Sequence, residues 1–91
     1  MGLYDWNREK ERINVWKHGV SFLEAESVLD NPSSSTRHDE LHSIREHRFI
    51  TVGWSAMGRL LVVVTSNGGR RPRIISAWRA TKRERDAYAR R

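Results

Sequence analysis

The sequence predicts an α+β domain built on a mostly antiparallel sheet. The main observation is Leu60–Val64, a run of five aliphatic residues of which three are β-branched. Because apolar and polar residues do not alternate in this run, both faces of the strand must be covered, which is typical of a central strand. Arg48–Trp54 and Arg73–Arg79 also have strand composition, and turn-forming residues at 55–58 and 67–69 separate the three runs. We therefore expect an antiparallel meander with Leu60–Val64 in the middle.

Length and composition predict a single domain spanning residues 1–91. A chain of this size buries only about 60–65% of the surface that its unfolded form exposes, so its core is too small to enclose a large cofactor. The sequence has no cysteine, which excludes disulfides and thiolate metal sites and suits a reducing compartment. Its N-terminus lacks the pattern of a signal peptide, and no apolar run approaches the roughly 18–20 residues of a membrane span. These observations predict a cytoplasmic protein with no membrane partner.

Charge is distributed unevenly along the chain. Residues 1–46 hold six Lys and Arg against nine Asp and Glu, a net charge of −3, whereas residues 47–91 hold eleven against two, a net charge of +9. All but one of the eleven cations in the second half are arginine, whose planar guanidinium matches phosphate oxygens and stacks on bases. The second half is therefore predicted to bind a polyanion such as nucleic acid. The alternative is a basic surface that only keeps the protein soluble.

The first elements of the chain are a short strand and a helix. Leu3–Trp6 alternates weakly and is expected to be a strand at the sheet edge. Asn7 is a good N-cap, Arg8–His18 has helix-forming composition, and Gly19 stands where a left-handed C-terminal cap belongs. The side of this helix expected to face the sheet carries Ile13 and Trp16.

A second helix is predicted over about Phe22–Leu29. Ser21 and Glu24 have the spacing of a capping box, in which the serine caps the helix and the glutamate reaches back to the serine N–H. The helix ends before Asn31-Pro32, because the residue before a proline is pushed out of helical geometry. Both N-terminal helices are expected to pack on one face of the sheet. The residues of this helix expected in the core are Phe22, Ala25, Val28 and Leu29.

Two further segments are less regular. Ser33–Arg45 is the least decided segment, and Ser33–Thr36 within it has the composition of a loop or a polar edge strand. Thr81–Glu84 is a second capping box and opens a last helix that extends to about Arg90. This C-terminal helix is polar nearly all round, so we expect it to dock weakly or to be held by a partner.

The residues in several ordered motifs resemble the signature of the BrnT toxins, a family within the RelE-like superfamily. The motifs are Lys17–Phe22, Gly53–Ser55, Gly58–Val64 and Arg73–Ala77. The resemblance implies a RelE-like fold and an RNA-cleaving toxin that inhibits translation. It also implies a ribbon-helix-helix antitoxin of the BrnA type, an RNA substrate that is free or associated with the ribosome, and contact with operator DNA only through the antitoxin. Trp78 departs from the family, which more usually has a basic or small residue there.

Metal-free RNA cleavage sets its own chemical requirements. It needs a base for the attacking 2′-hydroxyl, an acid for the leaving 5′-oxygen, and cations against the charge that grows on the phosphate. Histidine can perform either proton transfer near neutrality. His42, Glu46 and Arg48 match the His…Glu-x-Arg pattern of the family. We expect His42 to act as base or acid, Glu46 to orient it or share the proton transfer, and Arg48 to hold phosphate.

Other candidates lie outside this triad. Lys17 and His18 match the family, although cations in the last turn of a helix also complement the helix dipole without any function. Arg73 and Arg79 are two and four positions from Ile75, so alternation puts them on one face, where they would border a cleft and bind phosphate. The alternative is that both pair with acidic residues of the first half. Arg79 joins the catalytic candidates, and the residues expected to bind RNA are Arg59, Arg73, Ser76, Lys82 and Arg83.

A zinc site is the alternative for the histidine-rich segment. His38 and His42 are spaced so that they would share a helix face, as zinc ligands often do. The cationic residues Arg37, Arg45 and Arg48 oppose a metal ion, and no catalytic-metal motif is complete. We therefore expect no metal and no cofactor. His38 and His47 are expected to be exposed to solvent.

A second class of function is a folded basic module without catalytic activity. Such a module would pair with a DNA-binding antitoxin and co-repress an operon without cutting RNA. Expression separates the two classes, because the enzyme should arrest growth and the module should not.

Overall fold

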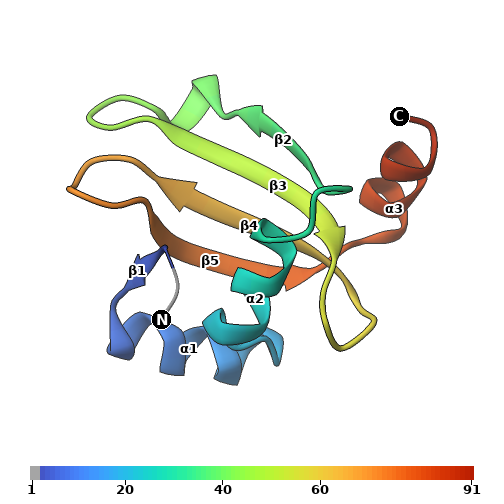
Figure 1. Ribbon diagram of the computed structural model, residues 1–91, viewed down its shortest axis with the longest axis horizontal. Coiled ribbons are helices and arrows are strands. Elements are labelled where there is room, and N and C mark those ends of the chain that lie inside the picture. Colours follow the sequence, from blue (N-terminus) through green and yellow to red (C-terminus); the bar gives the residue numbers. More distant parts are fainter. Residues whose placement is uncertain (1–2) are drawn as a thin grey trace.

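The computed structural model describes residues 3–91, which form one five-stranded sheet and three α-helices (Figure 1). The strands lie in the order β1-β5-β4-β3-β2 across the sheet. No helix within residues 3–91 is both long and apolar enough to cross a membrane. In chain order the elements are β1 (Asp5–Trp6), α1 (Arg8–His18), α2 (Phe22–Leu29), β2 (Ser35–His38), β3 (Arg48–Trp54), β4 (Leu60–Ser66), β5 (Arg73–Arg79) and α3 (Lys82–Ala89), with a 3₁₀ turn at Glu40–His42.

The predicted meander is confirmed. β3, β4 and β5 are paired antiparallel, and β4 is buried along its whole length between its two neighbours. β2 extends the sheet antiparallel to β3, so part of the undecided segment is an edge strand. The aliphatic run Leu60–Val64 therefore belongs to the central strand of the sheet, and both faces of this strand are covered.

The sheet is mixed, which corrects the prediction of a mostly antiparallel one. β1 runs parallel to β5, with Asp5 opposite Arg73 and Trp6 opposite Ile74. A parallel neighbour requires a long connection that returns the chain to the same end of the sheet, and α1, α2 and the meander provide it. Local alternation within a strand carries no information about the direction of a partner 68 positions away.

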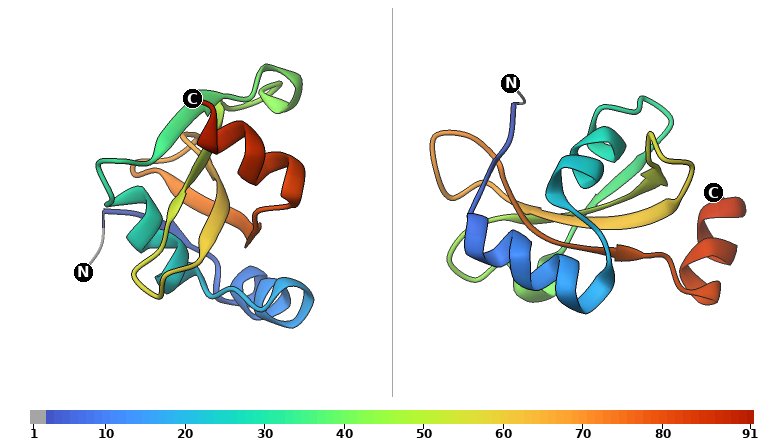
Figure 2. Two further views of the ribbon diagram at one scale, coloured as in Figure 1. Left: turned by 90° about the vertical axis from the view of Figure 1, so that its right-hand side faces the viewer. Right: turned by 90° about the horizontal axis from the view of Figure 1, so that it is seen from below.

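The N-terminal helices take different positions. α2 packs across one face of the sheet, whereas α1 lies along the β5 edge (Figures 1 and 2). Phe22 and Val28 are buried as predicted, and Phe22 meets the ring of Trp6 edge-on. The expectation that both helices cover one face is therefore not met by α1. The core beside α2 contains Val20, Phe22, Ala25, Val28, Leu61, Val63, Ile74 and Ala77.

Trp16 and Ile13 do not face the core, which corrects a second prediction. The Trp16 side chain is 84% exposed, and the buried residue of α1 is Asn14. Because β1 pairs with only two residues of β5, Ala77 at the sheet edge needs another hydrogen-bonding partner. The Asn14 carboxamide accepts a hydrogen bond from Ala77 N–H and donates to the carbonyl oxygens of Ala77 and Val20. α1 is therefore rotated so that the Asn14 amide faces β5 and the Trp16 side chain faces solvent.

The opposite face of the sheet is covered in part by α3, which lies across the sheet from α2 (Figure 2). Tyr88 of α3 packs against a small core of Leu60, Val62 and Ala80. The predicted capping box at the start of α3 is confirmed, since Thr81 Oγ1 accepts from Glu84 N–H and Glu84 Oε1 accepts from Thr81 N–H. We call the sheet surface on this side the open face.

β5 contains a β-bulge that reverses its alternation. Ile75 has no pairing partner among the residues of β4. As a result Ile74 and Ala77 both lie in the core beside α2. The prediction that Arg73 and Arg79 share a face is wrong, because the bulge places Arg79 on the side of α2 and Arg73 on the open face.

Candidate functional site

Three of the predicted catalytic residues line one hollow at the edge of the sheet. His42 comes from the 3₁₀ turn, Glu46 from the loop that follows, and Arg48 from the first position of β3. The loop turns back so that its two ends meet, which brings these residues together. We call this the rim hollow, and its lining residues are Leu41, His42, Ile44, Arg45, Glu46 and Arg48.

The His42 imidazole is held by a carboxylate that the sequence reasoning missed. His42 Nδ1 lies 2.9 Å from Asp39 Oδ2, and only 11% of the Asp39 side chain is exposed against 65% of the His42 side chain. An ionised carboxylate only accepts hydrogen bonds, so Nδ1 is the nitrogen that carries a proton, and in the neutral imidazole Nε2 holds the lone pair, directed away from Asp39. The spacing of an aspartate three positions before a histidine was the available signal in the sequence.

The loop beneath this pair is fixed by backbone hydrogen bonds. Asp39 N–H donates to the Arg48 carbonyl at 2.8 Å. Ser43 Oγ donates to the Asp39 carbonyl at 2.6 Å and accepts from Arg48 N–H at 2.9 Å. Asp39 and Arg48 are thus tied together, so the imidazole and the first residue of β3 have a defined separation.

Glu46 lies against the hairpin between β4 and β5. A Cβ atom at Gly68 would meet the Glu46 carboxylate, so the glutamate side chain and this position of the hairpin are in close contact. Glu46 therefore packs over the hairpin, while Arg45 and Arg48 supply the cations of the rim hollow.

Lys17, His18 and Ser76 come together in a different hollow, between the last turn of α1 and β5. The His18 ring lies 6.3 Å from the ring of Trp78. Two strands, β4 and β5, separate this hollow from β3, so Lys17 and His18 do not join His42.

Arg59 is occupied by a buried ion pair. Its guanidinium binds both carboxylate oxygens of Glu24, whose side chain is 3% exposed, and it also donates to the Gly19 carbonyl. The hydrogen bond to Arg59 lowers the pKa of Glu24, against the opposing effect of burial, and the same bond raises the pKa of Arg59. Glu24 also accepts from Ser55, so its side chain does not complete the predicted capping box, although Ser21 does cap α2. Arg59 was predicted to bind RNA, but its guanidinium N–H groups are hydrogen-bonded to the Glu24 carboxylate.

The remaining basic candidates are exposed at three places. Arg79 is exposed at the end of β5 beside Leu61, and Arg73 at its start beside Ser66. Lys82 and Arg83 lie in the first turn of α3, where Lys82 Nζ is 3.1 Å from Asp86 Oδ2. Arg79 is therefore at the opposite end of the sheet from His42, and the two residues do not share a cleft.

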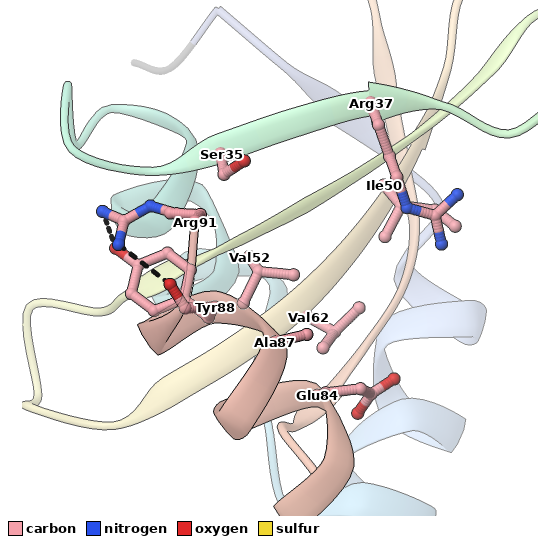
Figure 3. Close-up of a pocket in the computed structure, with 9 residues that line it drawn as sticks. All are labelled: Ser35, Arg37, Ile50, Val52, Val62, Glu84, Ala87, Tyr88 and Arg91. Carbon is pink, nitrogen blue, oxygen red and sulfur yellow. Dashed lines mark hydrogen bonds between the residues drawn. The ribbon is translucent and has the colours of Figure 1, made fainter.

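A cavity of about 210 Å³ lies between α3 and the open face (Figure 3). Its apolar floor comes from β3 and β4, and α3 closes one side. No ligand-binding role was predicted for these residues, although Glu84, Tyr88 and Arg91 are spaced to fall on one side of a helix. We call it the α3 cavity, and its lining residues are Ser35, Arg37, Ile50, Val52, Val62, Glu84, Ala87, Tyr88 and Arg91.

His38 and His47 are bonded to each other. His38 Nε2 lies 3.0 Å from His47 Nδ1, and the His38 ring also packs on Phe49. Among residues 3–91, no group of three or more His, Cys, Asp or Glu is arranged to hold a metal ion.

The chain was compared with known proteins. The family model described as the ribonuclease toxin BrnT of type II toxin–antitoxin systems matches residues 6–84. The crystal structure of the Brucella abortus ribonuclease toxin BrnT is similar, with a TM-score of 0.67 and 21% identity over 87% of this chain and 96% of that chain. No curated protein matches. The resemblance read from the sequence is confirmed, and the chain belongs to the BrnT family of ribonuclease toxins of type II toxin–antitoxin systems.

Proposed function

We propose that this chain is a metal-independent endoribonuclease that cuts RNA at the rim hollow and thereby inhibits translation. The observation that carries the proposal is the hydrogen bond from His42 Nδ1 to the nearly buried Asp39, beside Arg48. This arrangement supplies an oriented proton acceptor and a cation within one hollow.

The proposed reaction is an internal transesterification. His42 Nε2 takes the proton of the 2′-hydroxyl, and the 2′-oxygen attacks the adjacent phosphorus. The bond from phosphorus to the 5′-oxygen breaks, which leaves a 2′,3′-cyclic phosphate and a 5′-hydroxyl. The leaving 5′-oxygen takes a proton from a second donor, a role that we assign to Glu46.

Arginine side chains are proposed to stabilise the transition state. Arg48, together with Arg45, lines the rim hollow, where a guanidinium can donate two parallel hydrogen bonds to phosphate oxygens. Charge that builds up on those oxygens is then neutralised by groups already in place. Arg73, Lys82 and Arg83, exposed on the basic half, are proposed to bind flanking phosphates.

Membership of a type II family implies an antitoxin partner. We propose that this partner is a ribbon-helix-helix protein of the BrnA type and that the toxin contacts operator DNA only through it. The RNA substrate places the proposed activity in the cytoplasm.

Cleavage of a model RNA by the purified chain, with a chelator present throughout, tests the proposal. We expect fragments that end in a 2′,3′-cyclic phosphate and a 5′-hydroxyl, together with growth arrest on expression. Loss of activity in chelator would overturn the metal-independent reaction. A chain that neither cuts RNA nor arrests growth but strengthens operator binding by its antitoxin would be the non-catalytic module instead.

A further inference from the structure

The α3 cavity has the size and surface of a single-base site. We propose that it binds one nucleobase of the RNA, next to the phosphate that is cut, so this inference rests on the proposed cleavage at the rim hollow. Its volume of about 210 Å³ lies below the roughly 300–1,000 Å³ of pockets for larger ligands. The floor is apolar because Ile50, Val52 and Val62 project into it.

One side of the cavity offers planar groups for stacking. The guanidinium carbon of Arg91 lies 3.7 Å from the centre of the Tyr88 ring. Tyr88 Oη donates to the Ser33 carbonyl at 3.1 Å and accepts from Arg91, so the ring is fixed in orientation. Bases unstacked from RNA bind on aromatic rings and guanidinium planes of this kind.

The other end of the cavity offers polar groups of both kinds. Figure 3 shows the Arg37 guanidinium and the Glu84 carboxylate at the end away from Tyr88. Trp78 Nε1 donates to Glu84 Oε1 at 3.2 Å, which fixes the carboxylate. Arg37 can only donate hydrogen bonds and Glu84, when ionised, can only accept them, so together they match the mixed donor and acceptor edge of a base.

The cavity lies next to the rim hollow on the same surface. Arg48, Ile50 and Val52 alternate along β3, so their side chains share the open face. Arg48 belongs to the rim hollow and Ile50 to the α3 cavity, and two residues of a strand span about 6.6 Å. One nucleotide of an extended strand can cover that distance, with its phosphate at Arg48 and its base in the cavity.

The cavity is too small for a segment of the antitoxin. A stable protein interface buries about 800 Å² on each partner, whereas this cavity has room for little more than one large side chain. The two arginines in its lining also favour an RNA substrate over an apolar side chain.

A titration of residues 1–91 with nucleoside 3′-monophosphates tests the inference without requiring cleavage. We expect the amide NMR signals of Val52, Val62 and Tyr88 to shift with the nucleotides, whereas ribose 5-phosphate, which lacks a base, shifts only signals of the rim hollow. Identical shifts with both compounds would overturn the base site. Shifts of the cavity signals with the antitoxin but with none of the nucleotides would make the cavity a protein-binding site.

A matched pair of variants on α3 provides the second arm. Ala87→Trp fills the cavity, whereas Ala89→Trp places the same side chain on the same helix outside it. We expect Ala87→Trp to weaken binding of a non-cleavable 2′-O-methyl RNA by about tenfold, the contribution of one stacked base, and Ala89→Trp to bind as the parent does. Equal affinities for the two variants would overturn the base site.

The two proposals fail in different ways. If the parent cuts RNA and Ala87→Trp cuts at the same positions with the same base preference as Ala89→Trp, the base site is wrong and the cleavage proposal stands. If nucleotides shift the cavity signals but the parent does not cut RNA, the cleavage proposal is wrong and the chain is an RNA-binding module.

Discussion

The hydrogen bond between Asp39 and His42 links an exposed imidazole to a nearly buried carboxylate. It determines which ring nitrogen holds the proton, and hence which one can accept a proton from RNA. At the scale of single residues, the proposed chemistry depends on this orientation and on the cation at Arg48.

Replacement of His42 tests the base directly. We expect His42→Ala to lower the single-turnover rate about 10²–10⁴-fold and to leave RNA binding unchanged. Asp39→Asn should also slow cleavage, because an amide can donate a hydrogen bond to Nδ1 and then no longer fixes the tautomer. An unchanged rate for His42→Ala would assign the base to another group, such as Glu46 or Lys17.

The two arginines at opposite ends of the sheet should respond differently to substitution. Arg48→Ala is expected to slow cleavage about 10²–10³-fold, the effect of removing one good donor to the transition state. Arg79 lies at the far end of β5 on the side of α2, away from the rim hollow. Arg79→Ala is therefore expected to change the cleavage rate by less than about threefold. Rates measured at saturating RNA separate the two, and the reverse order would move the site toward α1 and β5.

At the scale of elements, buried polar groups decide how the helices dock. Asn14 joins α1 to the β5 edge, and Glu24 joins α2 to Arg59, the residue before β4. Both side chains are polar residues on helix faces where a hydrophobic pattern would place an apolar one. This explains why amphipathicity misplaced Trp16.

Substitution of Asn14 tests its role in docking α1. Asn14→Ala leaves the N–H and carbonyl of Ala77 without their partner, which should reduce the free energy of unfolding by about 2–3 kcal/mol. Trp16→Ala is the matched control on the same helix, and its exposed side chain should contribute less than about 0.5 kcal/mol. Urea unfolding measures both, and equal losses would contradict the observed rotation of α1.

The buried ion pair predicts a pH dependence of stability. Because the pKa of Glu24 is lower in the folded state than its ordinary value of 4.5, the stabilisation is fully present above that value and is lost as the pH falls through the folded-state pKa. Glu24→Gln should destabilise the protein by about 2–4 kcal/mol at pH 7 and flatten the acid limb. Glu9→Gln, which removes an exposed pair with Arg12, should leave stability nearly unchanged. Unfolding curves at pH 7 and at acid pH check both variants.

At the scale of the whole molecule, opposite charges are separated along the sequence. Residues 47–91, with a net charge of +9, supply β3, β4, β5 and α3, which form most of the open face and most of the lining of the α3 cavity. The rim hollow lies at the junction of the two halves, since residues 41–46 line it together with Arg48. The acidic half supplies α1 and α2 on the β5 edge and the other face.

This separation predicts a strong effect of salt on RNA binding. The logarithm of the affinity should fall linearly with the logarithm of the salt concentration. Replacing both Lys82 and Arg83 by alanine should reduce the slope by about 1.4 if each contacts a phosphate, whereas Arg12→Ala in the acidic half should leave it unchanged. Fluorescence anisotropy across a salt series measures these slopes, and equal slopes would exclude α3 from the RNA path.

The sequence by itself determined the elements whose causes are local. The aliphatic run at Leu60–Val64 identified the central strand, Asn7 and Gly19 bounded the first helix, and Thr81 began the last one. Each of these signals lies within a few residues of the feature that it specifies, so no knowledge of the remaining chain was needed. His42, Glu46 and Arg48, proposed from the family pattern, are also close in sequence, and all three line the rim hollow.

Only the tertiary structure decided the features that depend on distant partners. β1 runs parallel to β5 because the connection between them returns the chain to the same end of the sheet, and Asn14 replaces Trp16 at the interface because the β5 edge needs a hydrogen-bonding partner. The bulge at Ile75 separates Arg73 from Arg79, and residues from β2, β3, β4 and α3 enclose the α3 cavity. Each feature depends on contacts between residues that are distant in sequence, and the periodicity of apolar and polar residues along the chain does not encode such contacts.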